Sequence, residues 1–295
     1  MKLQFDANQE FQLQAIQATV DLFAGQPDAS QHGITINEEG LSSLRLNETG
    51  LANQRVISDE QLLNNLRDVQ REQQLPESEQ LEVLRDDEGN GIAAFPNFTV
   101  EMETGTGKTY VYLRSIHELH KTYGFKKFVI VVPSVAIREG VLKSLQITRE
   151  HFQTLYDFER VEFTVYDSAR VNQLRNFALS DALQILVINI DAFAKDSDER
   201  SNARRKGNVI NQRRETGIRP IEFIQATCPI VILDEPQNLE TVKRKQAIVR
   251  LNPLCTLRYS ATHRDSYNLI HKLDPIRAYE LGLVKQISVD SVIDL

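Results

Sequence analysis

Short runs of β-branched and other aliphatic residues alternate with amphipathic stretches from residue 98 onward, and this alternation restricts the fold more than any other feature of the sequence. The runs have the length and composition of strands, and they comprise residues 98–102, 128–132, 161–165, 183–188, 230–233 and 256–259. Several are almost continuously apolar, as is typical of parallel strands that are covered on both faces. The sequence therefore predicts an α/β domain with a mostly parallel sheet and helices on both faces.

The chain before residue 98 is organised differently. Apolar residues recur at helical spacing over residues 10–23, and Gly25-Gln-Pro27 ends the pattern, so a short opening helix is predicted. Residues 28–97 are polar, and their one convincing element is a helix after Ser58, which resembles a capping box together with Gln61. We expect this polar insertion to be partly ordered and to loop away from the sheet.

Acidic residues outnumber basic ones by 41 to 34, which gives a formal net charge of −7. Such a chain does not bind polyanions over its whole surface, so a nucleic acid would have to meet a local basic patch. Basic residues gather between positions 200 and 219, and they include Arg204, Arg205, Arg213 and Arg214. They indicate either contact with a phosphate backbone or a solvated basic loop.

The two cysteines, Cys228 and Cys255, are too few and too far apart for a disulfide framework or a CxxC metal site, which favours a reducing compartment. We expect both side chains in the core. No apolar run reaches the roughly 18 residues that a membrane span requires, and residues 1–6 do not resemble a secretory signal. The expected location is therefore the cytoplasm, without membrane contact.

A glycine-rich segment, Thr104-Gly-Thr-Gly-Lys-Thr109, follows the strand predicted at 98–102 and precedes a helix predicted at 110–119. Glycines let backbone amides curl around phosphate oxygens, and the positive end of the following helix points at them. In such a loop the Lys108 ammonium reaches the β- and γ-phosphates, and the Thr109 hydroxyl coordinates Mg²⁺. Met102 stands where glycine or alanine is common, so it either narrows the loop or alters the packing beneath it.

Two carboxylates, Asp234 and Glu235, directly follow the strand predicted at 230–233. Ligands gather at the carboxyl ends of the strands of an open parallel sheet, so Asp234 can meet a metal held by Thr109, and Glu235 can orient or deprotonate water. Ser260-Ala-Thr262 ends the next predicted strand, and its hydroxyls could connect the nucleotide site to a neighbouring surface. The alternatives are solvated carboxylates at a loop entrance and ordinary turn-forming hydroxyls.

In this order, Thr104-Gly-Thr-Gly-Lys-Thr109, Asp234-Glu-Pro-Gln237 and Ser260-Ala-Thr262 resemble motifs I, II and III of superfamily-two helicases and translocases. The sequence is more closely similar to the Res subunit of type III restriction enzymes, in Met102 to Tyr110, in the Pro-Gln after Asp-Glu, and in Pro275-Ile-Arg-Ala-Tyr-Glu-Leu-Gly-Leu-Val-Lys285. The resemblance covers most of the chain. It implies a RecA-like P-loop domain with the polar insertion placed before the phosphate loop.

The resemblance also implies roles for individual residues. A glutamine ahead of motif I reads adenine in the wider family, because an amide can both donate to and accept from the base; Gln12 matches best, with Gln9 and Gln14 as competitors and an ordinary exposed glutamine as the alternative. Residues that would bind the nucleotide are Gln12, Thr104, Gly105, Thr106, Gly107, Lys108, Thr109, Gln237, Ser260 and Thr262. Those that would act in catalysis are Lys108, Asp234 and Glu235, with Thr109 and Asp234 at the metal.

Two further segments resemble elements that face nucleic acid in the family. They begin at Pro133-Ser134 and at Asn189, each directly after a predicted strand. Simple capping of the following helix is the alternative for both. Together with the arginines at 204, 205, 213 and 214, these residues are the candidates for contact with DNA.

For the whole enzyme, the resemblance implies that ATP and Mg²⁺ are used for translocation along double-stranded DNA before cleavage, together with a modification methyltransferase subunit. We expect an N-terminal helix (1–27), the insertion (28–97), a motor lobe (98–275) and the start of a linker (276–295). The second motor lobe, which supplies an arginine to the transferred phosphoryl group, and the nuclease domain are expected outside this chain. The chain alone should therefore turn over poorly.

Other readings remain open from the sequence. The motor lobe of a type I restriction subunit, or of another DNA helicase, has nearly the same motifs. A P-loop kinase would use a basic lid and would not need Ser260-Ala-Thr262. A binding module that holds nucleotide without turnover would show no DNA-stimulated hydrolysis even beside the rest of the subunit.

Overall fold

The computed structural model describes residues 5–28, 52–194, 208–214, 217–263 and 266–284. The α-helices in these ranges are α1 (Glu10–Asp21), α3 (Asp59–Glu72), α4 (Lys108–Tyr123), α5 (Val135–Leu155), α6 (Gln173–Leu179), α7 (Pro220–Gln225), α8 (Val242–Val249) and α9 (Pro275–Glu280). The strands are β1 (Asn97–Met102), β2 (Lys127–Val132), β3 (Val161–Val165), β4 (Leu183–Asn189), β5 (Ile230–Asp234), β6 (Cys255–Ser260) and β7 (Leu269–Leu273). Short 3₁₀ helices are η3 (Ile190–Ala192), η4 (Val209–Asn211) and η5 (Pro236–Leu239).

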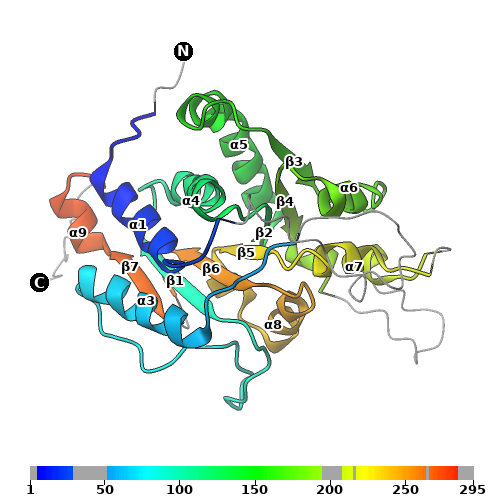
Figure 1. Ribbon diagram of the computed structural model, residues 1–295, viewed down its shortest axis with the longest axis horizontal. Helices are drawn as coiled ribbons and strands as arrows, with labels where there is room; N and C mark the ends of the chain where they lie inside the picture. Colours follow the sequence, from blue (N-terminus) through cyan, green and yellow to red (C-terminus); the bar gives the residue numbers. More distant parts are fainter. Residues whose placement is uncertain (1–4, 29–51, 195–207, 215–216, 264–265, 285–295) are drawn as a thin grey trace, which may run out of the picture.

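The strands form a seven-stranded sheet in the order β3-β4-β2-β5-β6-β1-β7, and all neighbours pair in parallel (Figure 1). Every run predicted as a strand forms one, with bounds that differ by at most one residue at either end. The carboxyl ends of β5, β6 and β1 lie side by side although they are far apart in the sequence. The predicted RecA-like P-loop fold is thus confirmed.

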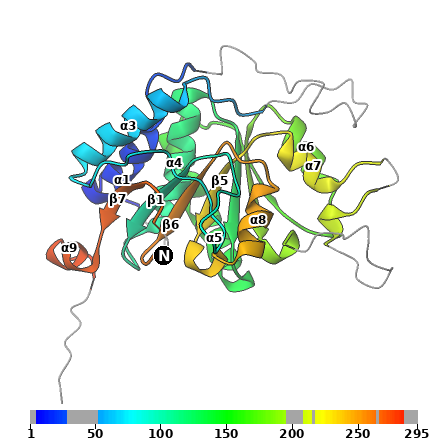
Figure 2. The same cartoon turned by 90° about the horizontal axis from the view of Figure 1, so that it is seen from below.

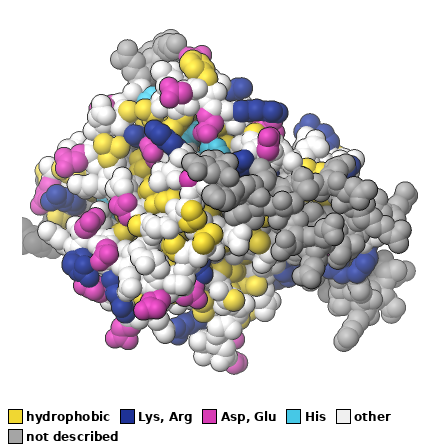
Figure 3. Space-filling view, viewed as in Figure 1, with side chains coloured by type: hydrophobic (Ala, Val, Ile, Leu, Met, Phe, Trp, Pro, Cys, Tyr) yellow, Lys and Arg dark blue, Asp and Glu magenta, His cyan; other side chains and the backbone are white. Residues whose placement is uncertain are grey.

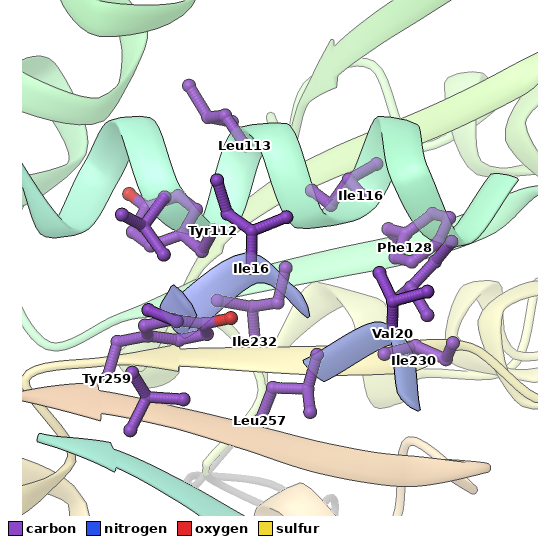
Figure 4. Close-up of a cluster of buried hydrophobic side chains, with 14 of the residues drawn as sticks. Ile16, Val20, Tyr112, Leu113, Ile116, Phe128, Ile230, Ile232, Leu257 and Tyr259 are labelled. Atoms are coloured by element: carbon purple, nitrogen blue, oxygen red, sulfur yellow. The ribbon is translucent and has the colours of Figure 1, made fainter. Parts of the chain in front are cut away.

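Helices cover both faces of the sheet (Figures 1 and 2), with α1, α4 and α5 on one face and α6, α7 and α8 on the other. Side chains alternate between the faces along each strand: Phe128 and Ile130 of β2 join the first core cluster, while Val129 and Val131 join the second. Both faces are therefore apolar, which explains the continuous apolar runs in the sequence. Figure 4 shows part of the first cluster, where α1 and α4 meet the strands through Ile16, Val20, Leu113, Ile116, Ile230, Ile232 and Leu257.

The described part of the polar segment before β1 packs against the sheet, which corrects the expectation that it loops away. α3 begins at its predicted cap, where Ser58 Oγ accepts a hydrogen bond from the Gln61 N–H. Its buried face, which includes Leu66, joins the core, and Gln70 Nε2 donates to the Leu269 carbonyl of β7 at 2.9 Å. Apolar residues occur there only every three or four positions, so the helix is polar on average although one face is buried.

β7 and α9 extend the sheet and its flank beyond the last predicted strand. β7 pairs with the free edge of β1, and Asp274 caps α9 by accepting a hydrogen bond from the Arg277 N–H at 2.9 Å. The expected linker (276–295) includes most of α9, and its last part, 285–295, lies outside the described residues. Whether the chain divides into the four expected domains stays a prediction.

The surface charge and the burial of the two cysteines were also predicted from the sequence. On the face shown in Figure 3, acidic and basic side chains are interspersed rather than separated by sign. Cys255 is buried as expected, whereas Cys228 is partly exposed, so the expectation of two core cysteines is wrong for Cys228. None of the helices in the described ranges is long and apolar enough to cross a membrane.

Candidate nucleotide site

The glycine-rich loop joins β1 to α4, as the sequence predicts. Gly105 and Gly107 have φ angles of +84° and +92°, a backbone conformation that side-chain-bearing residues rarely adopt. The Thr106 hydroxyl donates to the Glu103 carbonyl at 2.6 Å and closes the loop from within. The side chain of Met102 is fully buried in the core, so this departure from the common pattern changes the packing beneath the loop and leaves the loop itself open.

Gln12 of α1 lies directly over this loop. Its Nε2 donates to the Thr106 carbonyl at 3.0 Å, and a Cβ atom added at Gly107 would come within 2.5 Å of the same nitrogen. Of the competing glutamines, Gln14 is exposed and bonds to Glu10 on its own helix. The structure thus brings Gln12 to the phosphate loop, while its contact with adenine stays a prediction.

Lys108 and the two carboxylates meet at the carboxyl ends of β1 and β5. Lys108 is nearly buried, and its Nζ lies 3.3 Å from the Met102 carbonyl and 3.4 Å from Glu235 Oε1. Burial raises the pKa of Asp234 to about 6, the neighbouring charge of Glu235 adds to this, and Lys108 opposes it. The partly exposed carboxylate of Glu235 beside the buried carboxylate of Asp234 makes a site that favours a bound cation.

Glu235 is held by residues from the two predicted downstream motifs. Gln237 Nε2 donates to Glu235 Oε2 at 2.8 Å, and Ser260 Oγ lies 3.1 Å from the same oxygen and 2.8 Å from Gln237 Oε1. Although burial raises the pKa of Glu235, the hydrogen bond from Gln237 and the charge of Lys108 bring it below its usual value. Ser260 Oγ also accepts from the Thr262 N–H at 3.1 Å, so motifs II and III form one hydrogen-bonded cluster.

A hollow of about 340 Å³ opens beside the loop. This volume lies at the lower end of the range for small-molecule sites, which is about 300–1,000 Å³. Its lining comes from the phosphate loop, the segment before α1, and α5, with Phe5, Gly105, Gly107, Lys108, Thr109, Tyr110, Ser144, Ile147 and Thr148. The sequence analysis did not single out Phe5, Tyr110 or the α5 residues, because no local pattern marks side chains that meet only after folding.

The residues fit Mg²⁺ bound together with a nucleoside triphosphate. Among the described residues there is no cluster of three or more His, Cys, Asp or Glu side chains that could hold a metal. Mg²⁺ does not require one, because it is usually held by one or two carboxylates together with substrate phosphates and water. Thr109 and Asp234 would supply two oxygen ligands, and the glycines leave backbone amides free of any Cβ that would block an approaching phosphate.

Tyr112 was also missed by the sequence analysis. It lies in the first turns of α4, is fully buried, and its hydroxyl is 3.4 Å from Asp234 Oδ2. Burial raises the pKa of Tyr112 well above its ordinary value, the charge of Asp234 raises it further, and a hydrogen bond with the Thr109 side chain opposes both. A tyrosine within a helix reads as a core residue, and only the fold reveals that its hydroxyl faces the end of β5.

The candidates for nucleic-acid contact are less well supported. Pro133 is partly buried at the end of β2. Ser134 Oγ caps α5 by accepting from the Ile137 N–H at 3.3 Å, and Asn189 Oδ1 caps η3 by accepting from the Asp191 N–H at 2.8 Å. These are the capping roles that we gave as alternatives, and contact with DNA stays a prediction for all three residues.

Of the four candidate arginines, Arg213 and Arg214 are exposed, whereas Arg204 and Arg205 lie outside the described residues. Near the ends of β3 and β4 there is an open hollow of about 710 Å³ whose lining includes Arg138, Tyr166 and Arg170. This hollow was not predicted, because its lining residues come from α5, the end of β3 and the segments around η3 and η4, which meet only after folding.

Residues 51–265 match the family described as "Type III restriction enzyme, res subunit". Among curated relatives, the EcoP15I Res subunit of Escherichia coli is 29% identical over 247 residues, which cover 78% of this chain and 24% of that protein. The StyLTI Res subunit of Salmonella typhimurium is 36% identical over 188 residues, covering 57% and 18%. The EcoPI Res subunit of Escherichia phage P1 is 26% identical over 301 residues, covering 96% and 28%.

This chain thus spans between 18% and 28% of the length of these curated relatives. Among solved structures, the Sulfolobus solfataricus SWI2/SNF2 ATPase core in complex with dsDNA aligns with a TM-score of 0.36 at 14% identity, over 56% of this chain and 27% of that chain. A nuclease-deletion mutant of the Type ISP restriction-modification enzyme LlaGI, in complex with a DNA substrate mimic, aligns with a TM-score of 0.42 at 13% identity, over 77% and 20%.

Proposed function

Because the chain belongs to the family of Res subunits of type III restriction enzymes, we propose that it forms the ATP-binding motor lobe of such a subunit. One observation carries this proposal: Lys108 Nζ lies 3.3 Å from the carbonyl of Met102, at the end of β1, and 3.4 Å from Oε1 of Glu235, the residue after β5. A lysine in this position can exchange these contacts for the terminal phosphate oxygens of a nucleotide. The carboxylates then remain at the same sheet edge to act on the metal and on water.

The roles of the individual residues follow from their chemistry. Thr109 and Asp234 hold Mg²⁺, which neutralises charge on the phosphates when it is bound. Glu235 orients the attacking water and accepts its proton, and its bonds to Gln237 and Ser260 fix the direction in which it acts. Ser260 Oγ also accepts a hydrogen bond from the Thr262 N–H. A movement of Glu235 would therefore also move the residues that follow β6.

In the complete subunit, we propose that ATP hydrolysis is stimulated by double-stranded DNA and drives translocation before cleavage, in complex with a modification methyltransferase subunit. DNA would approach the carboxyl edge of the sheet, where Pro133, Ser134, Asn189, Arg213 and Arg214 are the candidates for contact. In the proposed mechanism a second motor lobe gives an arginine to the transferred phosphoryl group, which can be worth about 10³–10⁵ in rate. Nucleotide binding is therefore the property to test on these residues.

The first experiment replaces the lysine of the phosphate loop. Lys108→Ala should weaken the binding of ATP in the presence of Mg²⁺ at least about 10-fold, because charge-assisted bonds to phosphate are lost. Isothermal titration calorimetry measures the affinity. Lys121→Ala is the matched control, because Lys121 is exposed in the last turn of the same helix. The Lys121→Ala protein should bind ATP with the affinity of the wild type. Equal affinity of the Lys108→Ala protein and the control would reject the nucleotide site.

A further inference from the structure

Tyr112 places one buried hydroxyl between the two predicted metal ligands. Its OH donates a hydrogen bond to Asp234 Oδ2 at 3.4 Å, and the side chain of Thr109 interacts with the same hydroxyl. Thr109 and Tyr112 are three residues apart on α4, so their side chains lie on the same face of the helix. Asp234 reaches the same point from the end of β5.

The buried hydroxyl of Tyr112 has few possible hydrogen-bond partners. Tyr112 is 0% exposed, and burying a hydroxyl without a partner costs free energy, so its position depends on the groups that it bonds. Asp234 is 5% exposed and equally cut off from water. The two side chains therefore constrain each other more strongly than a pair at the surface would.

Packing fixes the ring of Tyr112 as well. It meets the ring of Tyr259 edge to face, with centroids 5.5 Å apart and an angle of 62° between the planes. Figure 4 shows both tyrosines in the same apolar cluster, Tyr112 on α4 and Tyr259 on β6. The hydroxyl of Tyr259 points to other partners, Thr19 Oγ1 at 3.4 Å and Ser115 Oγ at 3.5 Å.

We propose that Tyr112 is a positioning residue of the Mg²⁺ site, which holds the carboxylate of Asp234 and the hydroxyl of Thr109 in the arrangement that binds the metal. The proposal rests on the proposed function, since it concerns the metal that accompanies ATP. Tyr112 does not contact the metal or the nucleotide. It acts by removing the freedom of two ligands that come from different elements of the fold.

The test uses a pair of matched variants, Tyr112→Phe and Tyr259→Phe. Each removes one buried hydroxyl and keeps the ring, so both should lose a similar few degrees of melting temperature in EDTA. Calorimetric titrations with ATP are run in EDTA and over a series of Mg²⁺ concentrations. In Tyr112→Phe, affinity in EDTA should match the wild type, while the Mg²⁺ concentration that gives half of the metal-dependent gain should rise about 10-fold or more, as when other partners of metal ligands are lost.

Tyr259→Phe should show the Mg²⁺ dependence of the wild type. The proposal is overturned if Tyr112→Phe has that same dependence, or if both variants shift equally. A further comparison adds Tyr112→Phe to Asp234→Asn: because part of the effect of Tyr112 passes through Asp234, Tyr112→Phe should raise the required Mg²⁺ concentration by a smaller factor in Asp234→Asn than in the wild type. A wild-type protein that binds no ATP at any Mg²⁺ concentration would instead sink the proposed function.

A spectroscopic measurement keeps the proposal testable if Tyr112→Phe does not fold. In wild-type protein with ¹³Cζ-labelled tyrosine, each folded Tyr→Phe variant, such as Tyr259→Phe, identifies its own signal by losing it. The one signal that all of these variants keep belongs to Tyr112, and adding Mg²⁺ to the ATP complex should shift it. If every signal that shifts on Mg²⁺ addition is assigned to a tyrosine other than Tyr112, the metal site is formed without it.

Discussion

The side chain of Gln12 occupies the space above the phosphate loop that a Cβ atom at position 107 would need. The added Cβ at Gly107 would lie 2.5 Å from Gln12 Nε2, whereas nothing lies within 4 Å of the equivalent position at Gly105. Both glycines have positive φ angles, so an alanine is strained at either position by about 1–2 kcal/mol. Only at Gly107 does a steric conflict with another side chain add to that strain.

We predict that Gly107→Ala lowers the free energy of unfolding by more than Gly105→Ala does. Shortening the glutamine in the double variant Gly107→Ala/Gln12→Ala should recover the part of the loss that exceeds the Gly105→Ala value, because the clash is then removed. Urea unfolding of the four proteins, including the wild type, measures the differences. Equal losses in the two single variants would contradict the prediction and show that the flexible end of Gln12 moves away from the added Cβ without a measurable cost.

At the residue scale, the sequence predicted those parts of the site that lie in short contiguous motifs. The phosphate loop and Asp234-Glu235 could be found because a strand, a glycine-rich turn and a helix follow one another directly, and because two carboxylates end an apolar run. The partners that meet only across the fold could not be found. Tyr112 looks like any apolar position of α4 until β5 is placed beside it.

At the scale of elements, a polar clasp joins α4 to the segment after α5. His120 Nε2 lies 2.7 Å from Glu159 Oε1, and His117 Nδ1 lies 3.9 Å from Glu159 Oε2. Although burial raises the pKa of Glu159, its close contact with His120 and the nearby His117 lower it to about 2. The clasp lies at the opposite end of α4 from the phosphate loop, so it anchors the helix that carries Lys108.

This clasp predicts a stability change in acid. The pKa of Glu159 in the folded protein is below its ordinary value of 4.5, so its contribution is present above about pH 4.5 and is lost as the pH falls toward about 2. Allowing for screening, because Glu159 is only half-buried, the contribution is about 1 kcal/mol. Glu159→Gln should therefore unfold more easily at neutral pH and lose less stability across that acidic window, as measured by urea titration at each pH. The control Glu139→Gln, on the exposed side of α5, should keep the wild-type pH dependence.

The elements themselves were predicted where their patterns are strong. The buried strands could be predicted from their runs of β-branched residues. β7, Leu269–Leu273, was missed because it contains His271 and Lys272 and forms only by pairing with β1 in the folded protein. The packing of α3 was missed because most of its residues are polar. Its polar majority suggested a solvated segment, yet a single apolar stripe is enough to dock a helix on a sheet edge.

At the scale of the whole molecule, net charge limits how DNA can approach. A formal charge of −7 repels a phosphate backbone at long range, so DNA would have to bind at a local group of basic side chains. Arg138 and Arg170 line the hollow near the ends of β3 and β4, and Arg213 and Arg214 are exposed. Contact with DNA should therefore be local and strongly dependent on salt.

We predict that Arg213→Gln/Arg214→Gln weakens binding to duplex DNA and reduces the salt dependence of the affinity. Each lost phosphate contact should lower the slope of log K against log salt by about 0.9. Fluorescence anisotropy at several salt concentrations measures both quantities. Arg71→Gln/Arg277→Gln removes the same charge from exposed positions on α3 and α9, so it separates a local contact from a change in net charge. If both double variants alter the slope equally, Arg213 and Arg214 make no specific contact.

The order of strands in the sheet has a consequence for how the protein is made. β1, which leads into the phosphate loop, lies between β6 and β7, which come last in sequence among the described strands. Until residues 255–273 have been synthesised, both hydrogen-bonding edges of β1 stay open to other partners. Nascent chains are thus exposed to mispairing at β1 until those residues have been made, and the candidate nucleotide site forms through contacts distant in sequence, which form slowly.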